Sequence, residues 1–84
     1  DAYLQTQCAL AIIKEVLIKA GASLEDVVRT RIYVTDISQW GAIGKAHGEV
    51  FAHIKPATTM VEVSRLIDAE YLVEIEATAI ISSL

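Results

Sequence analysis

The sequence has one cysteine, one proline and no apolar run long enough to cross a bilayer. A lone Cys8 cannot form an internal disulfide, which excludes a disulfide-rich secreted domain and favours a reducing compartment. A membrane-spanning helix needs about 20 apolar residues in succession, and no stretch resembles a signal peptide. We therefore expect a soluble, cytoplasmic protein that has no membrane as a partner.

Positive charge is also scarce. Seven basic residues stand against 11 acidic ones, which gives a net charge of −4, and the basic residues are scattered along the chain. Binding to a nucleic-acid backbone needs clustered positive charge. Nucleic acid is therefore not expected as a partner.

Motifs that hold metals, phosphates or nucleophiles are missing as well. The sequence has no Cys/His cluster with metal-ligand spacing, no phosphate-cradling glycine loop and no G-x-S-x-G turn. His47 lies on an apolar helical stripe, where a hydrogen-bonded core histidine is the expected role, and His53 points elsewhere on the same helix. We expect no metal and no cofactor.

Apolar surface, in contrast, is abundant. Of the 84 residues, 54% are hydrophobic, a high share for one domain (residues 1–84) that hides only about 60 to 65% of the surface of its unfolded chain. Some of this apolar surface is expected to meet another subunit. The chain opens on Asp1 and not on Met, which is compatible with its being part of a longer protein.

Two periodicities of apolar residues, one helical and one alternating, predict the helices and strands. One helix runs from a capping Asp1 to a stop at Gly21, and a second follows a candidate cap at Ser38 and ends before Pro56. Residues 28–35, 58–64 and 71–79 alternate as half-buried strands do. The predicted order is α-β-α-β-β, an α+β fold with both helices on one face of a single sheet. The helical stripes comprise Ala9, Ile13, Val16, Leu17 and Ala20 in the first helix and Trp40, Ile43, His47, Val50, Phe51 and Ile54 in the second.

The alternation also predicts a second, helix-free face of the sheet that mixes charged and apolar residues. A face bathed in water would be more polar than this one, so we expect the sheets of neighbouring subunits to meet there and their charges to pair. A plain solvent face is the alternative. The charged members are Arg29, Arg31, Glu62, Glu74 and Glu76, and the apolar members are Val27, Met60, Leu72 and Ile80.

Three glycines line one flank of the second helix, at Gly41, Gly44 and Gly48. Each glycine inside a helix costs about 0.5 to 1 kcal/mol relative to alanine. One reading is that another backbone or a ligand comes close to this flank. The other is a weak, frayed helix.

Three stretches together carry a family resemblance: QTQCALAIIKEVLIKAGASLEDVVRTRIYVTDI, then PATTMVEVSRL, then LVEIEATAII. With the spacings AG-x-S-x-x-DVV-x-T, P-A-x-x-x-V-x-V and EIEA, the chain resembles the RidA family (also called YjgF or L-PSP) over nearly its whole length. The resemblance implies a chorismate-mutase-like fold and a homotrimer with small-molecule sites in the clefts between subunits. The family's N-terminal strands are absent from residues 1–84.

The resemblance also implies a chemistry. Active family members hydrolyse imines or enamines to a ketoacid and ammonia, with an arginine that binds the substrate carboxylate and a glutamate that positions or activates water. The glutamate matches Glu74, which is the candidate catalytic residue. The arginine position is Thr58, a frequent cysteine is Met60, a frequent asparagine is Gly44 and a frequent tyrosine is His47. We take Thr58, Met60 and Gly44 as candidate substrate-binding residues.

Thr58 sets this chain apart from the active members. A guanidinium has a permanent charge and makes a bidentate hydrogen-bonded contact with a carboxylate, whereas a threonine hydroxyl is neutral and donates one hydrogen bond. The chain therefore resembles the branches of the family that lack the arginine. Arg31, which is expected on the same sheet face as Thr58 and Glu74, is a candidate replacement, and the alternative is that Arg31 only neutralises glutamates of the interface. Glu74 likewise has two readings: a role in the site, or a carboxylate that only balances an arginine at the interface.

The sequence thus predicts a homotrimer that binds a small metabolite of the ketoacid, imine or enamine type. One reading adds deaminase or hydrolase activity, and the alternative is a binding trimer without turnover. Ribonuclease activity, which the family name suggests, conflicts with the acidic charge balance.

Overall fold

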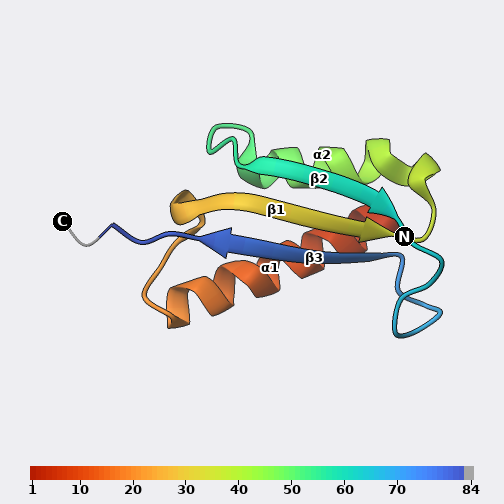
Figure 1. The fold of residues 1–84 in the computed structure, drawn as a ribbon, viewed down its shortest axis with the longest axis horizontal. Helices are drawn as coiled ribbons and strands as arrows, with labels where there is room; N and C mark the ends of the chain where they lie inside the picture. Colours follow the sequence, from red (N-terminus) through yellow and green to blue (C-terminus); the bar gives the residue numbers. More distant parts are fainter. Residues whose placement is uncertain (83–84) are drawn as a thin grey trace.

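The computed structural model describes residues 1–82, and its elements follow the predicted order. Helices α1 and α2 lie on the same side of the sheet (Figure 1), so the predicted α+β fold is confirmed. The helices are α1 (Ala2–Lys19) and α2 (Trp40–Phe51), and the strands are β1 (Val27–Val34), β2 (Ala57–Glu62) and β3 (Val73–Ala79). Short 3-10 helices at Leu24–Asp26 and Ile37–Gln39 precede β1 and α2.

The sheet has the strand order β2-β1-β3. β1 runs parallel to β2, with α2 as the crossover between them, and antiparallel to β3. The register places Thr30 of β1 opposite Thr58, and Tyr33 of β1 opposite Glu74. Residues opposite each other share a face of the sheet, so this register decides which candidate residues can meet.

Helix α1 begins and ends as predicted. The Asp1 side chain accepts a hydrogen bond from the backbone N–H of Leu4 at 2.9 Å, which satisfies one of the free donors of the first turn. Gly21 has a φ of 84°, the left-handed conformation that commonly ends a helix. The buried row of α1 differs from the predicted stripe, because Leu10 is buried whereas Val16 is 59% exposed.

Gln5 ties α1 to the segment that enters β3. Its side-chain amide donates to the backbone oxygen of Glu70 at 2.9 Å and its carbonyl accepts from the backbone N–H of Leu72 at 2.7 Å. The amide thus pairs with this backbone as a neighbouring strand would. It fixes where Val73 and Glu74 begin the last strand.

The predicted cap of α2 at Ser38 is wrong. Ser38 lies inside the short 3-10 helix Ile37–Gln39, which Asp36 caps by accepting from the backbone N–H and the hydroxyl of Ser38 at 3.0 and 2.6 Å. Gln39, the residue that precedes α2, makes no side-chain capping hydrogen bond. Hydrogen bonds from both Ser38 groups lower the pKa of the Asp36 carboxyl. Trp40, which was expected in the buried stripe, is 66% exposed, while Ile43 and Phe51 are buried as predicted.

The core lies between the sheet and the helices in two clusters. One joins Ala2 of α1, Ile43 of α2 and the strand residues Ile32, Val34 and Val73. The other comprises Leu10, Val27 and Phe51, with Ile75 touching both clusters. Neither helix in residues 1–82 combines the length and apolar character that crossing a membrane requires.

Several predicted face assignments are wrong. A β-bulge at Val28 turns Val27 into the core, at 3% exposed, and leaves Val28 at 44%. In β2 the alternating set of residues that faces the helices is the opposite of the predicted one, because Thr58 lies opposite the buried Thr30 and Met60 lies opposite the buried Ile32. Thr58 and Met60 therefore face the helices, as does Glu62, which is on the same face by alternation. Leu72 also packs against the core, whereas Ile80 is exposed.

Candidate functional site

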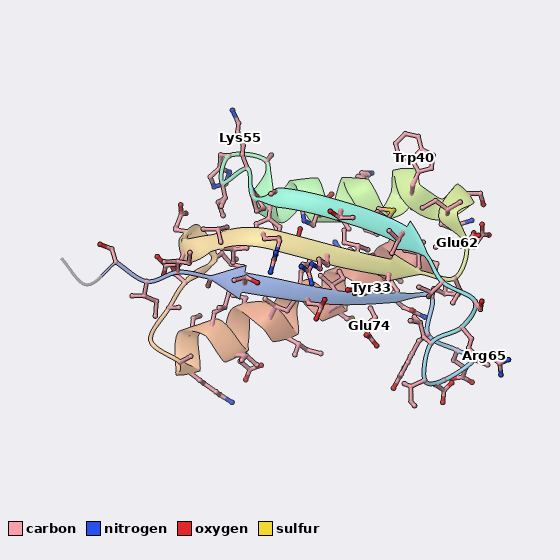
Figure 2. The ribbon with its side chains drawn as sticks, viewed as in Figure 1. Tyr33, Trp40, Lys55, Glu62, Arg65 and Glu74 are labelled. Carbon is pink, nitrogen blue, oxygen red and sulfur yellow. The ribbon has the colours of Figure 1, made fainter. Side chains whose placement is uncertain are left out.

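The helix-free face of the sheet is polar at its centre, as Figure 2 shows around Tyr33 and Glu74. We call it the open face. The Tyr33 hydroxyl donates to Glu76 at 2.7 Å, and Arg31 lies 3.8 Å from the same carboxylate. The hydrogen bond to Glu76 raises the pKa of Tyr33. By register, the open face carries Arg29, Arg31, Tyr33, Thr59, Val61, Glu74, Glu76 and Thr78.

Glu74 is the exposed, unpaired acid of this face. It stands opposite Tyr33, but the Tyr33 hydroxyl is used by Glu76. Within residues 1–82 the Glu74 carboxylate makes no hydrogen bond or ion pair. This carboxylate is therefore available to a water molecule or to a group outside the chain.

Thr58 lies on the other face, in a chain of hydrogen bonds that runs into the protein. Its hydroxyl is 2.8 Å from that of Thr30, which is fully buried, and Thr30 is 2.9 Å from Nε2 of His47. The His47 ring stacks on Phe51 with 4.7 Å between ring centroids. Burial of the imidazole lowers the pKa of His47. The expected core histidine is thus hydrogen-bonded, and its partner is a residue that connects it to Thr58.

The other predicted binding residues divide between the two faces. Met60 packs against the core cluster of Ile32 and Val34. Arg31 is on the open face, so the expectation that Arg31 and Thr58 share a face is wrong. A Cβ built on Gly44 would have no neighbouring atom within 4 Å in the described part of the chain, and the same holds for Gly41 and Gly48. Among the described residues, no backbone makes the close approach that one reading expected at these glycines.

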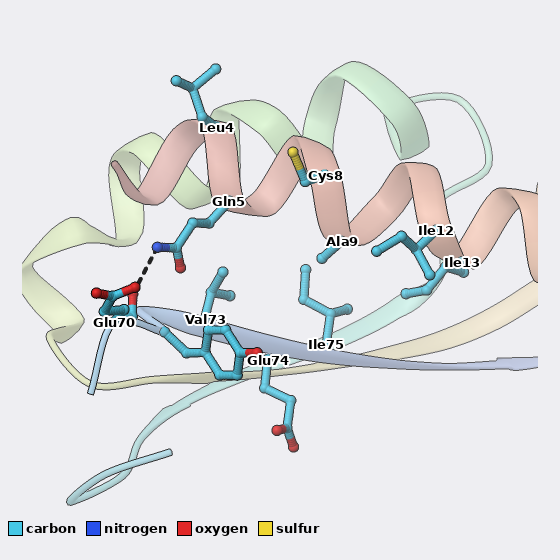
Figure 3. Close-up of a pocket in the computed structure, with 11 residues that line it drawn as sticks. Leu4, Gln5, Cys8, Ala9, Ile12, Ile13, Glu70, Val73, Glu74 and Ile75 are labelled. Atoms are coloured by element: carbon cyan, nitrogen blue, oxygen red, sulfur yellow. Dashed lines mark hydrogen bonds between the residues drawn. The ribbon is translucent and has the colours of Figure 1, made fainter. Parts of the chain in front are cut away.

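A groove of about 580 Å³ runs between α1 and the outer edge of β3. Figure 3 shows the apolar side chains Ile12, Val73 and Ile75 along it, with Cys8 on α1 and the Gln5–Glu70 hydrogen bond at one end. Glu74 also lines this groove, and its side chain points away from α1 (Figure 3). The groove and the open face therefore meet at Glu74.

Residues 1–82 contain no group of three or more histidine, cysteine or acidic side chains that could hold a metal ion. Thr30 is the member of the hydrogen-bond chain whose role the sequence pattern does not indicate. Its position in a strand predicted burial, but only the register, which brings it opposite Thr58 and beneath His47, gives its hydroxyl a partner on each side. No signal in the sequence specified that register.

A sheet with two helices on one face and a mixed charged face on the other defines a small α+β protein of the kind that the resemblance implied. The profile of the family described as Endoribonuclease L-PSP matches residues 1–81, and the chain belongs to this family. The crystal structure of Rv2704 from Mycobacterium tuberculosis, a member of the YjgF/YER057c/UK114 family, is similar with a TM-score of 0.96. The two are 54% identical, over 96% of this chain and 69% of that one.

Two curated relatives extend the comparison. A RutC family protein of Pyrococcus abyssi is 41% identical over 75 residues, which are 89% of this chain and 58% of the relative. The 3-aminoacrylate deaminase RutC of Acinetobacter baylyi is 37% identical over 79 residues, which are 94% of this chain and 62% of the relative. The chain thus spans about three fifths of these relatives.

Proposed function

We propose that the protein is a homotrimer that binds a small carboxylate of the ketoacid, imine or enamine type between its subunits and hydrolyses the imine or enamine form. The likeness to the deaminase RutC over 94% of this chain carries the proposal. The exposed, unpaired carboxylate of Glu74 supports it, because general base catalysis needs a carboxylate that is free to accept a proton.

The positions of Thr58 and Glu74 favour a site made by two subunits. Their partners on β1 are Thr30 and Tyr33, three residues apart, which is about 10 Å along a strand. β2 and β3 flank β1, so the two residues are also separated by two strand spacings of about 4.8 Å each. Their side chains leave opposite faces, so one small acid meets both only when each comes from a different subunit.

The chemistry that fits these groups is hydrolysis of a carbon–nitrogen double bond. In the imine tautomer of the substrate, water adds its oxygen to the C=N carbon and a proton reaches the nitrogen. Collapse of this adduct forms the carbonyl and expels ammonia. Glu74 takes a proton from the attacking water and returns it to the departing nitrogen, while Thr58 donates a hydrogen bond to the substrate carboxylate.

Ammonia release from freshly generated 2-aminoacrylate and from 3-aminoacrylate tests the activity. We expect a rate above the buffer blank that falls about 100-fold or more in Glu74→Gln, since general acid–base catalysis contributes at least that factor. Glu76→Gln is the matched control, because Glu76 stands on the same strand face but is held by Tyr33 and Arg31. A rate equal to the blank with both substrates contradicts turnover and favours the second function, a binding trimer.

We assign Arg31 to the open face as a partner of acids, and not to the carboxylate site of the same subunit. The 3.8 Å approach to Glu76 supports this role. Arg31→Met is therefore expected to lower stability or trimer affinity while pyruvate binding by the remaining trimer is unchanged. A specific loss of pyruvate binding in Arg31→Met contradicts the assignment.

A further inference from the structure

We infer that His47 and Thr30 orient the hydroxyl of Thr58 as a hydrogen-bond donor, so that this neutral residue selects an anionic group. The inference rests on the proposed function for the identity of the ligand. The direction of the hydrogen bonds rests on geometry alone.

The direction of these hydrogen bonds follows from the acceptor at their outer end, the backbone oxygen of Pro56, which cannot donate. The backbone oxygen of Pro56 can only accept, and it lies 3.3 Å from the Thr58 hydroxyl. With the Thr58 proton directed there, the 2.8 Å bond between the two threonines uses the proton of Thr30. Thr30 has no second proton for His47, so Nε2 of His47 carries the proton of the 2.9 Å bond between them.

All the donors therefore point outward, from His47 through Thr30 to Thr58. The inner members are shielded, because Thr30 is fully buried and His47 is half-buried against Phe51. The outermost proton is in the weakest bond, since 3.3 Å is longer than the roughly 2.5 to 3.0 Å usual for an O–H donor, and Thr58 itself is exposed. A carboxylate oxygen in front of Thr58 can take this proton from Pro56, and the bonds behind it strengthen the donor.

The reverse direction would give the site the opposite preference. If Nε2 of His47 were bare, it would accept from Thr30, Thr30 would accept from Thr58, and Thr58 would present only lone pairs to a ligand. A carboxylate would then be repelled. The tautomer of His47, which is two hydrogen bonds away from Thr58, is therefore a positioning element that sets the specificity at Thr58.

Nitrogen-15 NMR of the histidine rings tests the direction in the unliganded 84-residue protein. We expect that neutral His47 carries its proton on Nε2, so that the Nε2 resonance has the protonated shift and Nδ1 the bare one. The opposite tautomer overturns the inference. This readout does not depend on catalysis, so it separates a failure of the inference from a failure of the proposed function.

Ligand binding by Thr30 variants tests the consequence. Thr30→Val removes the inner donor and is expected to weaken pyruvate binding about 3- to 10-fold, the value of one hydrogen bond, while binding of neutral pyruvamide changes less than 2-fold. Thr30→Ser keeps the hydroxyl and is expected to retain wild-type affinity, which also covers the case in which Thr30→Val fails to fold. Equal weakening for both ligands, or loss of binding in Thr30→Ser with a folded spectrum, overturns the inference. If the wild type binds no pyruvate, the proposed function and the selective role of Thr58 both fail, whatever tautomer His47 adopts.

Discussion

At the scale of single residues, Thr58 is where the family resemblance predicts the largest chemical difference from the active members, a neutral hydroxyl in place of an arginine. A hydrogen bond from a hydroxyl to a carboxylate has one ionised partner and contributes roughly 1.5 to 3 kcal/mol, whereas an arginine adds a second hydrogen bond and a full positive charge. The buried chain through Thr30 and His47 strengthens the hydroxyl but adds no net charge. Affinity for a small acid is therefore expected to be modest.

Replacing Thr58 by arginine should raise that affinity. Thr58 is exposed, so the longer side chain can leave the surface without burying its charge. We expect Thr58→Arg to bind pyruvate about 5- to 10-fold more tightly, which corresponds to a gain of about 1 kcal/mol or slightly more. Isothermal titration calorimetry at fixed ionic strength measures the change.

Thr59→Arg is the matched control. It adds the same charge one residue further along β2, but on the open face, opposite Arg31 in the register. A similar gain in both variants would mean that net charge, and not the position of Thr58, determines the affinity.

His47 makes stability depend on pH. Burial lowers the pKa of His47 in the folded state below its usual 6.5, so the unfolded chain binds a proton more readily than the folded one. The stability contributed by neutral His47 is fully present above about pH 6.5 and declines as the pH falls below it. We expect urea unfolding to show this decline between pH 7 and pH 5, and His47→Phe to flatten it.

His53→Phe provides the comparison for this titration. His53 is exposed at the turn after α2, so the variant removes a histidine without removing the buried ring. We expect His53→Phe to keep the wild-type slope of unfolding free energy against pH. A slope that disappears in His53→Phe and persists in His47→Phe would contradict the assignment.

At the scale of elements, the turn between α2 and β2 carries the one positive φ that is not at a glycine in residues 1–82. Lys55 has a φ of 58°, and its N–H donates to the backbone oxygen of Phe51 at 2.9 Å, which ends the helix. A left-handed conformation costs roughly 1 to 2 kcal/mol for a residue with a Cβ. This unfavourable conformation occurs where the chain turns from α2 toward Pro56 and Thr58.

Lys55→Gly should therefore stabilise the protein. We expect the free energy of unfolding to rise by about 0.5 to 1 kcal/mol, because glycine adopts this conformation without the clash. Lys14→Gly, in the exposed middle of α1, should lower it by about 1 kcal/mol. Chemical denaturation of the two variants in parallel measures both changes, and a loss of stability in Lys55→Gly would refute the account of this turn.

The elements themselves were predictable from the sequence, but the faces of two strands were not. In β3 the apolar positions alternate strictly with Glu74, Glu76 and Thr78, so only one arrangement buries the apolar set, and that prediction is confirmed. In β2 both alternating sets mix polar and apolar residues, so hydrophobicity specified the face only weakly. The bulge at Val28 is a local change of period that alternation alone does not reveal.

The candidate site was predictable only in part for the same reason. Glu74 was placed on the correct face because β3 has a clear pattern. The prediction that Thr58 and Arg31 share a face of the sheet is wrong, because it depends on which alternating set of β2 residues faces the helices. The connection from Thr58 to His47 depends on register and helix position together, which no local pattern encodes.

At the scale of the whole molecule, the open face carries fewer apolar side chains than the sequence predicts for a subunit interface. Val27, Met60 and Leu72 belong to the core side, so the face is more polar than the sequence suggested. The apolar strip that remains on the open face includes Val61, which is 41% exposed and lies opposite Tyr33. An interface built here would combine this apolar strip with charge pairs, as transient and permanent interfaces both do.

A charge placed in that strip tests the proposed trimer and the shared site in one variant. We expect light scattering of the wild type to report three times the mass of one chain, and Val61→Glu to shift it toward a single chain, because a carboxylate buried between subunits without a partner costs several kcal/mol. Pyruvate binding should be lost with the trimer, since Thr58 and Glu74 of one subunit lie on opposite faces and cannot share a ligand. Val16→Glu on α1 is the matched control, because Val16 is 59% exposed and is not on the sheet. A Val61→Glu variant that dissociates yet binds pyruvate normally would show that one subunit suffices for the site.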